Sequence, residues 1–102
     1  MTTSSTTRHA LPWDDICNEV KRAMRAFAMH EGQPDLYVVN CRFLAQYIAL
    51  HPAEYPAINN DAMFKAIQSR VTMSMNMMGW KAWTRGNKCG RGMKYIVPWE
   101  EL

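Results

Sequence analysis

The first regular pattern of hydrophobic and polar positions begins after Pro12. Apolar side chains recur at intervals of three and four residues, which builds one face of an amphipathic helix: Trp13, Ile16, Cys17, Val20, Met24 and Phe27. A proline before the pattern, and Asp14 and Asp15 in its first turn, favour a helix start. Because Gly32 follows closely, the sequence predicts that this helix ends near His30.

A short β-favouring run and a second helical pattern follow. Residues 36–39 (Leu-Tyr-Val-Val) are too few for a helix and suit a small edge strand. Asn40 is a good N-cap for the next segment, where apolar residues recur at helical spacing over 43–50. This second helix is predicted to stop at His51, because the residue before a proline, here Pro52, disfavours the α region.

A third helix is predicted after an irregular connection around Pro56. Residues 59–61 (Asn-Asn-Asp) offer N-caps for this helix, and Gly79 ends it. One of its faces is apolar and carries Phe64, Ile67, Val71, Met75 and Met78. The opposite face is small, polar and basic, but it also exposes two methionines, Met73 and Met77.

The last part of the chain has the pattern of a β-hairpin with a long tip. Two β-favouring runs, 80–85 and 93–99, flank a segment that contains three glycines. Alternation along the first run predicts Trp80, Ala82 and Thr84 on one face and Lys81, Trp83 and Arg85 on the other. The predicted fold class is therefore α+β, with three helices, a short strand and a C-terminal hairpin.

Composition adds that the chain forms one domain. With 102 residues and 48% hydrophobic content, it can fold alone around one core. Residues 1–11 are predicted to be a disordered polar tail before a domain over 12–102. No apolar run approaches the roughly 18 residues of a membrane span, and the start does not resemble a secretory signal. We therefore expect a cytoplasmic protein that has no contact with a membrane.

Charge is unevenly distributed along the chain. From Ala62 to Trp99 there are seven cationic side chains and no acidic one. The cations are Lys65, Arg70, Lys81, Arg85, Lys88, Arg91 and Lys94. The earlier part of the chain is near neutral, so the net charge of +3 understates the polarity. A field of one sign attracts polyanions, which makes nucleic acid the first partner to consider.

The candidates for metal binding and catalysis are weak. The three cysteines are far apart, and neither they nor the three histidines have metal-ligand spacing. No combination of nucleophile, base and orienting acid can be proposed from the sequence. We expect a non-enzymatic protein with no metal and no cofactor.

The order of the elements is that of a winged helix. The segment 69–81, which ends in Met78-Gly79-Trp80-Lys81, leads into an Arg/Lys/Gly loop and then Tyr95-Ile96-Val97-Pro98. This segment resembles the C-terminal winged-helix domain of phage and plasmid primase-helicases and related replication proteins. Met78 stands where that pattern usually has leucine, and the chain has no phosphate-binding loop of an ATPase. The resemblance covers residues 40–99 and implies DNA binding in replication or transcription control.

The hairpin, or wing, is the first candidate for the DNA contact. Five cations lie on or beside its glycine-rich tip: Lys81, Arg85, Lys88, Arg91 and Lys94. Contacts of this kind bind phosphates without reading sequence. The alternative is a solvated hairpin that only adds solubility.

The third helix is the candidate for recognition in the major groove. Asn60, Lys65, Ser69, Arg70 and Asn76 could contact base edges there, or could be ordinary surface residues. Three cations of the first helix, Lys21, Arg22 and Arg25, could touch a flanking phosphate or form a solvated face.

Two further groups of side chains could bind a partner. Trp83 shares its strand face with Lys81 and could stack on an unpaired base, whereas Trp80 and Trp99 are better suited to closing the base of the hairpin. Met73 and Met77 could instead anchor a protein partner, because methionine adapts to irregular surfaces. Duplex DNA is therefore the expected ligand, and a protein partner is the alternative.

Overall fold

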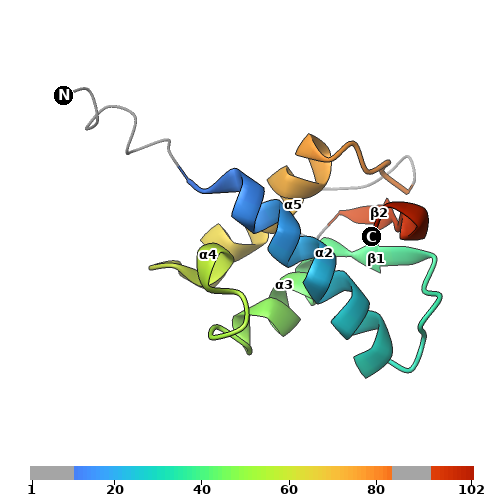
Figure 1. The fold of residues 1–102 in the computed structure, drawn as a ribbon, viewed down its shortest axis with the longest axis horizontal. Helices are drawn as coiled ribbons and strands as arrows, with labels where there is room; N and C mark the ends of the chain where they lie inside the picture. Colours follow the sequence, from blue (N-terminus) through green and yellow to red (C-terminus); the bar gives the residue numbers. More distant parts are fainter. Residues whose placement is uncertain (1–10, 84–92) are drawn as a thin grey trace.

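Four helices and a two-stranded sheet make up the computed structural model, which describes residues 11–83 and 93–102 (Figure 1). In chain order the elements are α2 (Trp13–His30), β1 (Val38–Asn40), α3 (Cys41–Ala49), α4 (Pro56–Asn59), α5 (Phe64–Met77), β2 (Lys94–Ile96) and a 3-10 turn, η1 (Trp99–Glu101). The α+β class is confirmed, but the structure adds the helix α4, and the described part of the predicted strand 80–85 forms only an isolated bridge at Ala82. Leu11, the last residue of the predicted tail, packs against the core and so belongs to the domain.

Two helices end at a glycine in the left-handed backbone region. Gly32 follows α2 with φ of 73°, and Gly79 follows α5 with φ of 80°, where any other residue would be strained. After α5, the N–H of Gly79 donates to the carbonyl of Asn76 (3.0 Å), and the N–H of Trp80 donates to the carbonyl of Met75 (2.9 Å). This is the Schellman arrangement that satisfies the last carbonyls of a helix. Both predicted helix ends are confirmed.

Asn40 joins β1 to α3 as predicted. Its Oδ1 accepts hydrogen bonds from the backbone N–H of Arg42 at 2.8 Å and of Phe43 at 3.4 Å. These are donors of the first turn, which have no partner within the helix. One residue thus ends the strand and starts the helix, so no loop separates the two elements.

The prediction of an irregular connection around Pro56 is wrong. Pro56 begins the short helix α4, at a position where its missing N–H costs nothing. Glu19 of α2 lies at this helix start and is 6% exposed. Its Oε2 accepts from the N–H of Ala57 and its Oε1 from the N–H of Ile58, both at 3.0 Å. A buried carboxylate on one helix therefore caps another.

Residues 59–61 close α4 and do not open α5. The Nδ2 of Asn59 donates to two backbone carbonyls, at 2.9 and 3.1 Å. Asp61 has φ of 51°, in the left-handed region that Asp and Asn tolerate better than most residues. α5 begins at Phe64, after Met63 and without a side-chain cap. The predicted N-cap is wrong because Asn and Asp also favour helix ends and turns.

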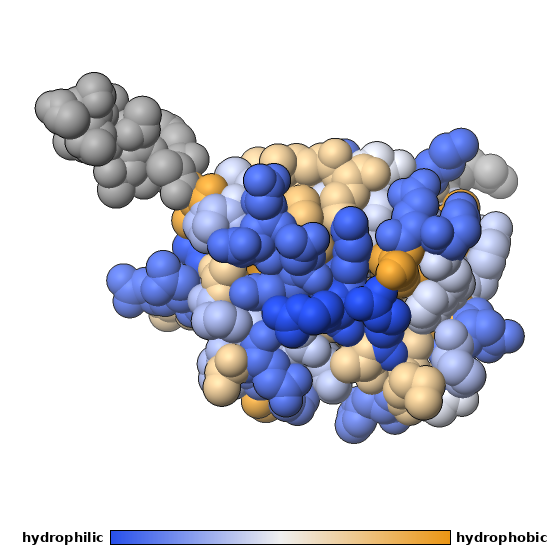
Figure 2. Space-filling model, in the orientation of Figure 1, coloured by the Kyte–Doolittle hydropathy of each residue, from blue (hydrophilic) through white to orange (hydrophobic). Residues whose placement is uncertain are grey.

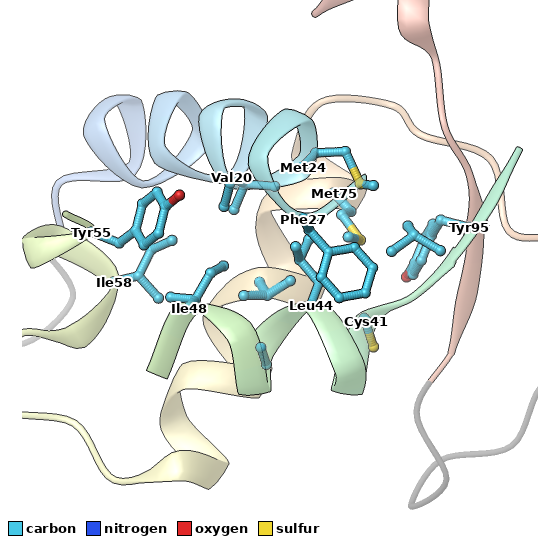
Figure 3. Close-up of a cluster of buried hydrophobic side chains, with 14 of the residues drawn as sticks. Val20, Met24, Phe27, Cys41, Leu44, Ile48, Tyr55, Ile58, Met75 and Tyr95 are labelled. Atoms are coloured by element: carbon cyan, nitrogen blue, oxygen red, sulfur yellow. The ribbon is translucent and has the colours of Figure 1, made fainter. Parts of the chain in front are cut away.

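The hydrophobic core lies where α2, α3 and α5 meet (Figure 3). Phe27 of α2 faces Leu44 of α3 in this core, and Met75 of α5 lies beside them. Tyr95 of β2 enters from the side of the sheet and is 1% exposed. In the described ranges, every buried side-chain nitrogen and oxygen has a hydrogen-bond partner. The burial of apolar surface is the main stabilising contribution of such a core.

The sheet closes one end of the helical layer. β1 pairs antiparallel with β2, with Val39 opposite Tyr95. Ala82 forms a bridge with Tyr95 from the other side, so β2 lies between β1 and the chain around Ala82. The first arm of the hairpin, predicted over 80–85, is shorter than expected as far as the structure describes it. The predicted tip of the hairpin lies outside the described residues.

Removing the Glu19 carboxylate should destabilise the fold. Glu19→Ala leaves two N–H groups of α4 without their acceptors, which should cost about 3 kcal/mol in the free energy of unfolding, measured by urea titration. Glu19→Gln keeps one acceptor oxygen and should lose less. Asn18→Ala, an exposed change on the same helix, should stay within about 0.5 kcal/mol. Equal losses for Glu19→Ala and Asn18→Ala would contradict this role.

Tyr55 should make the protein less stable in alkaline solution. Burial, and then the nearby Tyr47 and Glu54, raises the pKa of Tyr55 from 10.0 to about 12. Between these values the unfolded chain loses the phenol proton more readily than the folded one, so stability falls as the pH rises. From pH 9 to pH 11 this loss should be about 1 kcal/mol. Urea titrations should show a loss that is smaller by this amount in Tyr55→Phe than in the wild type; equal losses would contradict the assignment.

Candidate nucleic-acid interface

The exposed face of α5 carries four of the predicted contact residues in one row. Lys65, Ser69, Met73 and Met77 lie four residues apart, which aligns them along the helix, and all four are exposed. Met73 is 49% exposed and Met77 is 56% exposed. Asn60 is also exposed, at the end of α4. The row therefore combines one cation, one hydroxyl and two flexible apolar side chains.

Arg70 has a role inside the fold. It is half-buried, and its Nη1 donates to the carbonyl of Ile58 at 2.9 Å and to that of Asn60 at 3.1 Å. Both carbonyls belong to the C-terminal end of α4, where a cation is favoured. The guanidinium therefore connects α5 to α4, a positioning role that the sequence did not indicate.

Asn76 joins α5 to the sheet. Its Oδ1 accepts from the hydroxyl of Tyr95 at 2.9 Å. Burial raises the pKa of Tyr95, and the neighbouring Cys41 raises it further, while the hydrogen bond to Asn76 acts in the opposite direction. Asn76 is nevertheless exposed, so its amide lies at the surface where the end of α5 meets β2.

The outer face of the sheet presents the described part of the predicted wing. The N–H of Trp83 donates to the carbonyl of Lys94 (2.8 Å), and the N–H of Ile96 donates to that of Lys81 (2.9 Å). Lys81, Trp83 and Lys94 are exposed, and Trp83 is 44% exposed. The predicted phosphate contacts Arg85, Lys88 and Arg91 lie outside the described residues.

Two cations of α2, Arg22 and Arg25, make contacts within the fold. Hydrophilic side chains cover the middle of the face on which α2 lies (Figure 2). Arg22 donates to the carbonyl of Glu54 at 3.2 and 3.3 Å, and its guanidinium lies 5.4 Å from the centre of the Tyr55 ring. Arg25 donates to the carbonyl of Leu102. These contacts give both arginines a local partner on the surface of the fold.

Trp80 and Trp99 lie at the base of the predicted hairpin. Trp80 is 6% exposed. Trp99 is half-buried, and its indole N–H donates to the carbonyl of Leu36 at 2.7 Å. Both side chains pack in or against the hydrophobic core.

Two residues with a role in the site were missed in the sequence. Glu19 borders the apolar stripe of α2, beside Val20. An acidic residue at such a position was the sequence signal for a buried, hydrogen-bonded carboxylate. Tyr37 was assigned only to a strand, yet its ring is 60% exposed and contacts Trp83 edge to face, with 5.8 Å between ring centres. Nothing local in the sequence indicates a contact between residues so far apart.

The described residues offer no metal-binding cluster of three or more His, Cys, Asp or Glu side chains. Their cysteines are ordinary for a core: Cys41 is buried, and the hydroxyl of Thr72 donates to its sulfur at 3.2 Å. Burial raises the pKa of Cys17, which makes its thiol less reactive. Within the same ranges, none of the helices has the length and apolar character that a membrane span requires.

Comparison with known proteins returned no relatives. No family model matches the chain, and no curated protein or solved structure matches it either.

Replacing Arg70 should affect folding more than binding. Arg70→Ala removes two hydrogen bonds to the end of α4 and should lower the free energy of unfolding by about 1–2 kcal/mol. Lys65→Ala, an exposed change on the same helix, should change it by less than about 0.5 kcal/mol. Urea titration of both variants provides the measurement. If Arg70→Ala unfolds at the same urea concentration as the wild type, the connecting role is refuted.

Proposed function

We propose that this protein is a winged-helix protein that binds duplex DNA without catalysis. The arrangement of the elements supports a winged helix: helix, strand, two helices and a longer helix precede the Ala82 bridge and β2. In that interpretation α3 and α5 form the helix-turn-helix, and α4 lies in its turn. β2 pairs with β1 on one side and meets Ala82 on the other, as expected when the last hairpin folds back onto the first strand.

The observation that carries the proposal is the separation of charge. The cations between Ala62 and Trp99 are interrupted by no acid. Those that the structure describes as exposed, Lys65, Lys81 and Lys94, lie on α5 and on the sheet beside it. A basic surface of this extent supplies the salt-dependent affinity that nucleic-acid binding needs.

The dimensions of α5 also fit a DNA groove. Its 14 residues span about 21 Å. A helix of about 10–12 Å diameter fits the major groove, which is about 12 Å wide. In our proposal Lys65, Ser69 and Asn76 face the groove, Arg70 positions the helix, and the loop with Arg85, Lys88 and Arg91 contacts phosphates. The resemblance seen in the sequence points to phage or plasmid replication or transcription control as the setting.

Duplex binding should depend steeply on salt. A labelled duplex of about 20 base pairs, followed by fluorescence anisotropy, should lose affinity with a log–log slope of about −0.9 per neutralised phosphate. In the Arg85/Lys88/Arg91 triple alanine variant the slope should become shallower by up to about 2.7, because three phosphate contacts are removed.

Two single changes serve as a matched pair in the same titration. Lys65→Ala on α5 should weaken binding, whereas Lys21→Ala, on the helix that packs against the other side of α5, should not. No binding of the wild type at low salt would refute the DNA proposal. Equal effects of the two changes would remove α5 from the contact surface.

A protein partner is the second candidate, and the exposed methionines favour it. Met73 and Met77 lie in the same row as Lys65, a position that suits an adaptable contact with another protein. Met73→Lys separates the two functions. A duplex-binding face should tolerate the added cation, and the affinity for DNA should stay equal or rise, whereas an apolar protein contact should be lost.

A further inference from the structure

Two exposed aromatic rings meet on the outer face of the sheet. Tyr37 precedes β1, and Trp83 follows Ala82 on the opposite side of β2. Neighbouring strands lie about 4.8 Å apart, so the two flanking segments are about 10 Å apart. The ring centres are nevertheless 5.8 Å apart with planes at 86°, so the two rings meet edge to face. The pair is held in place from both sides of the sheet.

The backbone fixes both members of this pair. Trp83 donates its N–H to the carbonyl of Lys94 (2.8 Å), and the carbonyl of Tyr37 accepts from the N–H of Val97 (2.9 Å). The rings themselves remain 44% and 60% exposed. Aromatic surface that is both rigid and exposed costs little entropy to use as a stacking surface.

A hollow beside the pair is lined by side chains of both charges. It measures about 300 Å³, and its lining includes Tyr37, Lys81, Glu100 and Glu101. Carboxylates repel a phosphate chain, but they accept hydrogen bonds from the exocyclic amines of bases. Phosphates are attracted instead to Lys81. The charges therefore suit a base edge in the hollow and a backbone outside it.

We propose that Tyr37 and Trp83 form a stacking site for an unpaired nucleobase where a strand leaves the duplex. This inference rests on the proposed function, since the duplex bound by α5 would bring the strand to the sheet. Stacking on aromatic rings accepts any base and adds affinity at each base bound. The preferred ligand is then a duplex with a single-stranded overhang or fork.

The test compares a blunt duplex with the same duplex carrying a short overhang at either end of one strand. The wild type should bind one of the overhang forms about tenfold more tightly than the blunt form. Trp83→Ala and Tyr37→Ala should each lose this difference while keeping the affinity for the blunt duplex, and Trp83→Phe should retain most of it. Phe43→Ala, a 56% exposed aromatic on α3, serves as the matched control and should behave as wild type. Thermal unfolding checks that each variant is folded.

The outcomes separate this inference from the proposed function. Equal wild-type affinity for blunt and overhang forms refutes the stacking site and leaves duplex binding intact. A Trp83→Ala variant that loses both affinities equally also refutes it. Binding of the overhang strand without any binding of the blunt duplex, abolished by Trp83→Ala, supports the stacking site and contradicts duplex binding by α5. Quenching of the tryptophan fluorescence by the overhang should be smaller in Trp83→Phe; unchanged quenching would count against the stacking site.

Discussion

The turn between α3 and α5 depends on two side chains that hold α4 from opposite ends. Glu19 of α2 accepts the first N–H groups of α4, and Arg70 of α5 donates to its last carbonyls. A helix of four residues has too few internal hydrogen bonds to be stable alone. Its ends must therefore be satisfied by the rest of the fold. These contacts hold α4 between α3 and α5, while α3 and α5 pack directly against each other in the core.

The sequence predicted those features that are decided locally. The amphipathic stripes of α2 and α3, the Asn40 cap and the stop at Gly79 each depend on residues a few positions apart. The helix at Pro56 was not predicted, because its first N–H groups are capped by Glu19 of α2. This residue lies 38 and 39 positions away from them in the sequence. The run of Asn and Asp before α5 has an ambiguous meaning, since these residues suit both ends of a helix.

The sequence predicted the charge of the candidate site but not the contacts that its side chains make. Uninterrupted cations in the sequence indicated a basic surface, and the described lysines of that segment are exposed. The internal roles of Arg70 and Asn76 were not visible, because each bonds to a group from another element. The sequence indicates Trp83 as a stacking candidate and places Tyr37 only in a short strand. In the fold, their segments lie on either side of β2, and the two rings are in contact.

The hydrogen bond between Tyr95 and Asn76 lies between the exposed row of α5 and the exposed side of the sheet. It connects β2 to the last turn of α5, where the helix meets the sheet. In the proposed function one duplex contacts both the α5 row and the sheet, and the separate contributions of two such connected surfaces do not simply add. In the proposed complex with a duplex, the two contacts would respond to the spacing between groove and backbone. Such a protein can prefer particular DNA shapes at positions where it touches no base.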